Sequence, residues 1–220
     1  AAMAEALNAL GLQLWSGARF DSAVAYLGQA RDVWAARNDS VGLGRAYNNL
    51  GVTYLRMGDM AKSLDAHQAS LVIRREAGLR LQEGRSLYHV ASVLVAQGHW
   101  RQADKFLRDS EAIARETEDQ IGLSYVMFMR GQWEKGQGQL ERSLDAYRQS
   151  LALRGAIGSP SLIAEANWAL CDAYRMLGDW PKAAEHAEQA AKAWREVAKP
   201  WAGLTMNEAN SSQAQSRLSG

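Results

Sequence analysis

Histidine, cysteine and acidic side chains most often perform catalysis or bind metals, and this sequence disperses them. Its four histidines, His67, His89, His99 and His186, fall in different repeats or on different faces of the repeating unit described below. None of them has a second histidine or cysteine at the spacing of a metal site. The lone Cys171 occupies a site that holds glycine or alanine in the other repeats, so we expect a small core residue rather than a nucleophile. The sequence therefore predicts no enzyme, no metal site and no cofactor.

The charges of the chain nearly cancel, with 25 lysines and arginines against 24 acidic residues in 220. This balance argues against a general nucleic-acid binder or a membrane-surface protein. No apolar run is long enough to span a bilayer. One cysteine cannot form an intramolecular disulfide, so a cytoplasmic location is expected. Because the chain begins inside a repeating pattern, we also expect a segment of a longer protein.

The sequence repeats itself every 40 residues, five times over. Small residues recur at two sites in each unit. The first site holds Gly11, Gly51, Ala91, Gly131 and Cys171, and the second holds Ala18, Gly58, Gly98, Gly138 and Gly178. Bulky apolar residues follow the second site two positions later, at Phe20, Met60, Trp100, Leu140 and Trp180.

Each unit is predicted to be a helix hairpin, because small residues let two helix backbones approach closely. The glycine of the second site stands between two helices, where a left-handed residue ends the first of them. Ten helices are therefore expected, with turns near the second-site glycines and near residues 38, 78, 118 and 158. A leucine in place of Gly98 is expected to overpack a helix contact.

Two segments carry a family resemblance: AYNNLGVTYLRMGDMAKSLDAHQASL at 46–71 and ANWALCDAYRMLGDWPKAAEHAEQA at 166–190 both resemble tetratricopeptide repeats. The unit is longer than the family's usual one, and in this it resembles repeats of kinesin light chains, of polarity adaptors that bind extended peptides, and of sensor regions in bacterial signalling ATPases and transcription activators. The resemblance implies an all-α, right-handed superhelical solenoid of five repeats at about 3–42, 43–82, 83–122, 123–162 and 163–200. Residues 201–220 are expected to form a capping turn and a flexible tail.

In tetratricopeptide repeats the first helix of each hairpin lines the concave face, so the resemblance places the partner-binding residues there. By position they are Asn8, Arg45, Asn48, Asn49, Arg56, Arg85, Tyr88, His89, Phe128, Gln132, Lys135, Trp168, Asp172 and Arg175. An asparagine amide can pair with both polar groups of a peptide backbone, and the cations favour acidic side chains. Replacing Asn49 or Arg85 by alanine is expected to weaken binding without affecting folding. The lysine and asparagine pattern of the family's carboxylate-binding branch is not reproduced.

Three functions remain open. The first is a protein-interaction module that holds an extended segment, acidic with apolar anchors, in its concave groove. The second is a ligand-sensing regulatory domain of a larger bacterial signalling or transcription-regulating protein, and the third is an enzyme, which the residues do not support. The open ends of the solenoid could also self-associate. Within the fourth repeat, Arg130 and Glu134 stand four residues apart, which predicts either a structural ion pair or a flexible joint.

Overall fold

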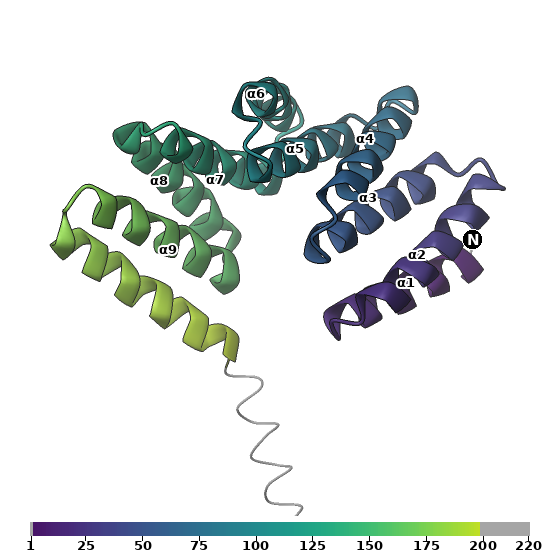
Figure 1. Ribbon diagram of the computed structural model, residues 1–220, viewed down its shortest axis with the longest axis horizontal. Coiled ribbons are helices and arrows are strands. Elements are labelled where there is room, and N and C mark those ends of the chain that lie inside the picture. Colours follow the sequence, from purple (N-terminus) through teal and green to yellow (C-terminus); the bar gives the residue numbers. More distant parts are fainter. Residues whose placement is uncertain (1, 199–220) are drawn as a thin grey trace, which may run out of the picture. The chain divides into compact units, whose positions relative to one another are not determined.

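The computed structural model describes residues 2–198, which form ten helices joined by short turns. Successive helices pair as hairpins, as Figure 1 shows. The helices are α1 (Ala2–Ser16), α2 (Phe20–Ala35), α3 (Ser40–Arg56), α4 (Met60–Glu76), α5 (Arg80–Ala96), α6 (Trp100–Glu116), α7 (Gln120–Gly136), α8 (Leu140–Ile157), α9 (Pro160–Met176) and a tenth over residues 180–198. The predicted all-α fold of five helix pairs is confirmed.

The turns recur every 20 residues, each with one residue in the left-handed region. These residues are Ala18, Asn38, Gly58, Gly78, Gly98, Glu118, Gly138, Gly158 and Gly178. At Gly58 φ is +82°, and the next N–H, of Asp59, donates to the Tyr54 carbonyl at 2.9 Å, which closes the end of α3. The Asp59 carboxylate then accepts from Lys62 N at 3.1 Å and caps α4. The predicted turn positions are confirmed.

The left-handed turn predicted at Gly98 is confirmed, but the close helix contact predicted there was wrong. A Cβ atom at this residue would meet only the Trp100 Nε1 atom, at 3.9 Å, so no helix contact would be overpacked. The glycine is needed because φ is +76° here, a conformation that a residue with a Cβ adopts at a cost. The second small-residue site therefore shapes turns.

The first small-residue site does make close helix contacts. A Cβ on Gly11 would lie 2.7 Å from the Leu27 Cγ atom, and one on Gly51 would lie 2.6 Å from the His67 ring. In the first, second and fourth repeats the glycine of this site faces the residue sixteen positions later, on the second helix of its own hairpin. Serines add hydrogen bonds to these contacts: Ser63 Oγ donates to the Gly51 carbonyl at 2.8 Å.

Successive repeats are joined through the end of each second helix. The Trp34 ring is fully buried and packs directly on Gly42, at the start of α3. One repeat later the same site holds Arg74, which is 8% exposed and donates to the Ser86 hydroxyl of α5 at 2.9 Å. Glycine makes room for both large side chains: Gly42 of the next helix for the Trp34 ring, and Gly44 of α3 for Arg74, whose Cγ atom would lie 3.1 Å from a Cβ there.

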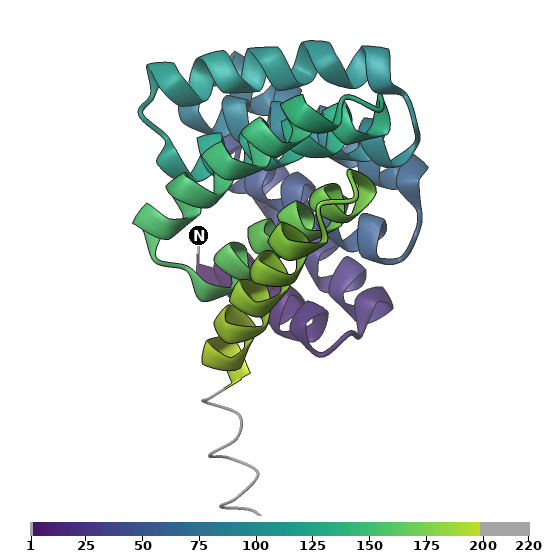
Figure 2. The same cartoon turned by 90° about the vertical axis from the view of Figure 1, so that its left-hand side faces the viewer.

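The chain divides into two compact units, with the boundary between Met129 and Arg130 inside α7. Unit 1 covers the described residues up to 129, and unit 2 covers residues 130–198. In unit 2 the helix of residues 180–198 lies along α9, where His186 Nδ1 and Asn167 Oδ1 are 2.9 Å apart (Figure 2). The capping turn and tail expected over residues 201–220 lie outside the described residues. Within the described residues no helix has the length and apolar character needed to cross a membrane.

Candidate functional site

Side chains of successive first helices meet along one surface of unit 1. Glu5 of α1 contacts Arg45 of α3, and Tyr88 of α5 contacts Tyr125 of α7 with ring centroids 5.5 Å apart. We call this surface the unit 1 face. It comprises Glu5, Asn8, Leu12, Arg45, Asn48, Asn49, Arg56, Arg85, Tyr88, His89 and Tyr125. Seven of the residues predicted to bind a partner lie here together with Asn8, as the repeat register requires.

Three asparagines form the amide part of the unit 1 face. Asn49 Nδ2 donates to Asn8 Oδ1 at 2.9 Å, which links α3 to α1. Asn8 is only 5% exposed, while Asn48 and Asn49 are half-buried. The Oδ1 atom of Asn48 is buried and has no hydrogen-bond partner. This amide group has hydrogen-bonding capacity that the chain itself leaves unused.

Two of the three arginines of the unit 1 face, Arg45 and Arg85, are paired with carboxylates of the chain. Arg45 NH1 lies 2.8 Å from Glu5 Oε2. Arg85 donates to both oxygens of Asp119, at 2.8 and 2.9 Å. Hydrogen bonding to Arg85 lowers the pKa of Asp119, and the same contact raises the pKa of Arg85. These pairings were not anticipated from the sequence, which treated the arginines as available to a partner.

Asp119 also has a structural role. Its Oδ1 atom accepts from the Gly122 N–H at 3.0 Å and so caps α7, and its side chain is only 6% exposed. Removing Arg85 would leave this carboxylate buried without its main partner. The expectation that Arg85→Ala leaves folding unaffected does not fit this geometry.

A stacked pair of histidines lies beside the tyrosines. The His67 and His89 rings are 4.8 Å apart and inclined by 6°, and Tyr88 meets His89 edge-on at 5.1 Å. His67 is fully buried, with neither ring nitrogen hydrogen-bonded. Burial, with nearby Arg74 adding a smaller effect, lowers the pKa of His67 to about 3 and that of His89 to about 4. The sequence-based view that the histidines are dispersed was wrong for this pair, because packing of adjacent repeats brings α4 and α5 together.

The remaining predicted residues of unit 1 differ in how far they are exposed to solvent. Arg56 is exposed, with its guanidinium 5.6 Å from the centre of the Trp15 ring. Phe128 is only 7% exposed, so it belongs mainly to the core of unit 1.

In unit 2, Asp172 pairs with two of the predicted cations. It lies 2.7 Å from Lys135 Nζ and 2.9 Å from Arg175 NH2. Trp168 is 55% exposed and lies against Trp194, with ring centroids 5.9 Å apart, whereas Gln132 is half-buried. Trp168 therefore offers the most accessible aromatic surface among the predicted residues.

For Arg130 and Glu134, where either an ion pair or a flexible joint was predicted, the structure gives a ring contact and a degree of burial. The Arg130 guanidinium lies 5.5 Å from the centre of the Trp133 ring, and Glu134 is 9% exposed. Their ion pair and the flexible joint both stay predictions.

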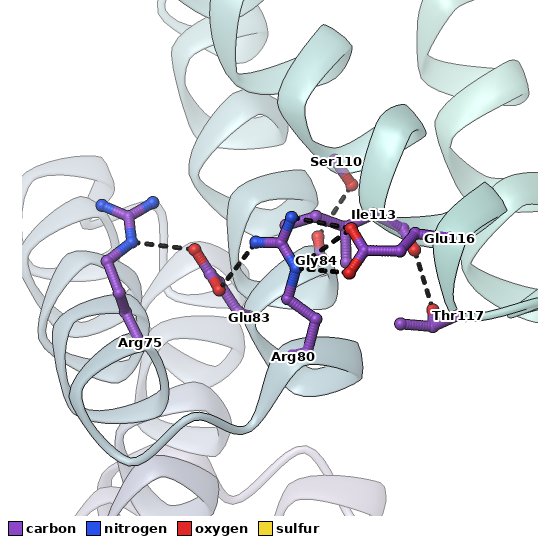
Figure 3. A network of polar contacts seen from close by, with 8 residues as sticks. All are labelled: Arg75, Arg80, Glu83, Gly84, Ser110, Ile113, Glu116 and Thr117. Carbon is purple, nitrogen blue, oxygen red and sulfur yellow. Dashed lines mark hydrogen bonds and ion pairs between the residues drawn. The ribbon is translucent and has the colours of Figure 1, made fainter.

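Figure 3 shows a charge network that the sequence interpretation missed, where α4, α5 and α6 meet. Glu83 is 9% exposed and accepts from Arg75 Nε at 2.8 Å and from Arg80 NH1 at 3.2 Å. Arg80 also reaches Glu116 at 2.8 Å. The i, i+3 spacing of Arg80 and Glu83 was the available signal. This network joins repeats and shares no residue with the unit 1 face.

No group of three or more histidine, cysteine or acidic side chains that could hold a metal ion occurs in residues 2–198. The arrangement on the unit 1 face is suited instead to hydrogen bonding and apolar contact, because it combines amides, tyrosines and neutralised ion pairs.

Solved structures with this fold come from several kinds of protein. BtubC of P. vanneervenii is 18% identical, with a TM-score of 0.73 over 89% of this chain and 81% of its own. A putative kinesin light chain of Podosopora anserina is 16% identical, with a TM-score of 0.62 over 88% and 95%. The Rap conjugation gene regulator of plasmid pLS20, in complex with the Phr* peptide, is 16% identical, with a TM-score of 0.76 over 85% of this chain; the chain spans about half of that regulator (52%).

No curated protein matches the sequence. The tetratricopeptide repeat family, however, matches it over residues 2–76 and again over residues 42–116. Together these matches cover more than half of the 220 residues. The chain belongs to the tetratricopeptide repeat family.

Proposed function

We propose that this chain is a protein-interaction module that binds an extended peptide segment along the unit 1 face. The observation that carries the proposal is the amide group of Asn8, Asn48 and Asn49. Asn49 uses one N–H to bond Asn8 and retains its carbonyl oxygen and second N–H. These groups match the alternating N–H and C=O of an extended backbone, so they can hold a segment through its main chain.

The family supports this proposal in general terms, because tetratricopeptide repeats are generally protein-interaction modules. The Rap regulator, which shares the fold, was solved with the Phr* peptide bound. In unit 2 the exposed Trp168 ring is suited to an apolar side chain of a partner.

The sequence favours an acidic partner with apolar anchors. In that form of the proposal Arg45, Arg56 and Arg85 meet carboxylates of the bound segment. The arginines paired within the chain would then contact two carboxylates each, one internal and one from the partner.

A second candidate is a ligand-sensing regulatory domain of a larger bacterial signalling or transcription-regulating protein. The likeness to the Rap regulator favours it, since that protein is a conjugation gene regulator solved with a peptide. The two candidates share the bound segment and differ in whether its binding changes the activity of an attached domain.

The test uses short random peptides displayed on phage, selected on the full chain and then measured by titration calorimetry. Asn49→Ala and Asn48→Ala should each weaken binding by about 2 kcal/mol, or about 30-fold. Gln68→Ala is the matched control, because Gln68 is an exposed amide on α4. It should change affinity by less than about twofold.

Thermal unfolding of each variant separates lost binding from lost folding, which matters for Asn49 because it bonds the buried Asn8. If the selected peptides bind both asparagine variants as well as the original chain, the unit 1 face is not the binding surface.

A further inference from the structure

We infer that the segment bound on the unit 1 face carries little net charge and is selected through its backbone and apolar side chains rather than through acidic ones. The inference rests on the proposed function and names the class of its partner. It follows from the charge pairing within the unit 1 face, which differs from what the arginine content alone indicates.

The first cation, Arg45, is already neutralised on the surface. Its guanidinium lies 2.8 Å from the Glu5 carboxylate, and both side chains are about half exposed, at 43% and 51%. A partner carboxylate that approached Arg45 would lie at a similar distance from Glu5. Attraction to the first and repulsion from the second largely cancel in water.

The second cation, Arg85, is held by its internal partner through two hydrogen bonds. It holds both oxygens of Asp119, and Asp119 is nearly buried and also caps α7. The Arg85 side chain is 43% exposed, but a partner carboxylate that approached it would also lie close to the Asp119 carboxylate, and drawing Arg85 away would leave Asp119 buried without its partner. Arg85 therefore supports the position of α7 and has little capacity left for an acidic ligand.

The third cation, Arg56, lies over the Trp15 ring in the last turn of α3 and is exposed. One exposed charge gives weak, salt-screened attraction and little selectivity.

The groups that remain for recognition are uncharged. They are the amides of Asn48 and Asn49, the half-buried tyrosines, and Leu12, which lies one turn after Asn8 on α1 and is 41% exposed. Amides pair with a peptide backbone whatever its side chains, and leucine and tyrosine side chains each offer apolar contacts to a bound segment. Together they fit an extended segment rich in apolar and uncharged polar residues.

The experiment uses the same displayed random peptides and keeps those whose affinity falls in Asn49→Ala, which restricts it to binders of the unit 1 face. Their mean net charge should be near zero. Raising the salt concentration from about 0.05 to about 0.5 M should change their affinity by less than about twofold.

A charge-release variant tests the cause. Glu5→Gln removes the internal partner of Arg45, so peptides given an added aspartate should now bind about threefold to tenfold tighter than they bind the original chain. Asp32→Asn is the matched control, because it makes the same change in the exposed Arg31–Asp32 pair of α2. It should not alter the affinity of acidic peptides.

The outcomes separate the inference from the proposed function. Asn49-sensitive peptides that are acidic, and that lose tenfold or more of their affinity in high salt, would overturn the inference and leave the proposed function intact. Acidic peptides that gain nothing in Glu5→Gln would also overturn it, because charge compensation would not be the cause. If no selected peptide is sensitive to Asn49→Ala, the proposed function fails, and the inference fails with it.

Discussion

A histidine occupies position 67 although the same site in other repeats holds Leu27, Leu107 and Tyr147. These three side chains are buried in their hairpins, and His67 is buried in the same way, against Gly51. An imidazole in this apolar site must stay neutral, because neither ring nitrogen has a partner that would stabilise the charged form. The residue therefore makes the stability of unit 1 depend on pH.

We predict that unit 1 loses stability as the pH falls below the ordinary histidine pKa of 6.5. Burial lowers the pKa of His67 to about 3 and that of His89 to about 4, so the unfolded chain binds protons that the folded chain does not. The stabilisation is fully present above pH 6.5 and is lost progressively towards the folded-state values. Between about pH 7 and pH 5 the free energy of unfolding should fall by about 2 kcal/mol through His67 and by a similar amount through His89.

Urea unfolding at a series of pH values measures this effect. His67→Leu restores the side chain found at the equivalent site of other repeats and should remove about half of the dependence between about pH 7 and pH 5, where carboxylates stay ionised. His99→Leu is the control, because His99 is exposed in the turn before α6 and its ring is not enclosed by a hairpin. Equal pH dependence in the original chain and in His67→Leu would contradict the prediction.

At this scale the repeat register predicted which side chains stand at equivalent positions of the first helices but not how they pair. The 40-residue register was enough to place Arg45 and Arg85 on first helices, because helix geometry repeats with the sequence. The partner of Arg85 is Asp119, 34 residues away at the cap of α7, and the distance between them depends on how two hairpins pack. The His67–His89 stack escaped prediction for the same reason.

At the scale of the helices, prediction from the sequence was more successful. The positions of helix ends followed from local signals. A left-handed residue ends one helix and a capping aspartate begins the next, as at Gly58 and Asp59. The sequence also identified the close contact between hairpin helices at Gly51. A glycine is needed either for a close helix contact or for a positive φ angle, and the sequence did not separate these two reasons. It therefore assigned a helix contact to Gly98, where the positive φ angle is the reason for the glycine.

We predict that two helical glycines respond oppositely to alanine. In Gly51→Ala the new Cβ would lie 2.6–2.8 Å from the His67 ring, which is fully buried and stacked on His89 and so has little freedom to move. The variant should lose about 1–3 kcal/mol of stability. In Gly28→Ala, nothing lies within 4 Å of the new Cβ in α2, so the higher helix propensity of alanine should add about 0.5–1 kcal/mol.

Thermal and urea unfolding of both variants give the comparison, with circular dichroism checking that helix content is kept. A Gly51→Ala protein as stable as the original would show that the assigned contact between α3 and α4 is wrong. Loss of stability in Gly28→Ala would indicate that α2 has a neighbour on that face that the contacts do not include.

At the scale of the whole molecule, stability comes from each repeat covering its neighbour. The Trp34 ring is covered by α3, and Arg74 donates to α5, so within unit 1 the second and third hairpins complete the core of the one before them. In unit 2 the fully buried Arg154 of α8 does the same, with NH1 donating to the Leu162 carbonyl of α9 at 3.0 Å. Contacts of this nearest-neighbour type predict that the chain can be shortened from one end.

We predict that a chain ending at Gly158, without the fifth repeat, keeps α1 to α5 folded. The loss should be local, because α8 would lose the repeat that covers it: Arg154 would lose the α9 carbonyl and the Glu165 carboxylate that it contacts at 3.0 and 2.9 Å, and the α8 face around it would be exposed to water. Helix α8 should therefore fray, while the contacts of unit 1 stay intact.

Hydrogen exchange followed by mass spectrometry measures this for each helix: protection in α1 to α5 should match that of the full chain to within about tenfold, and protection in α8 should fall much further. Circular dichroism should show helix content reduced roughly in proportion to the residues removed. Complete loss of helicity, or uniform loss of protection in all helices, would show that the repeats form one cooperative core rather than a series of neighbour-stabilised hairpins.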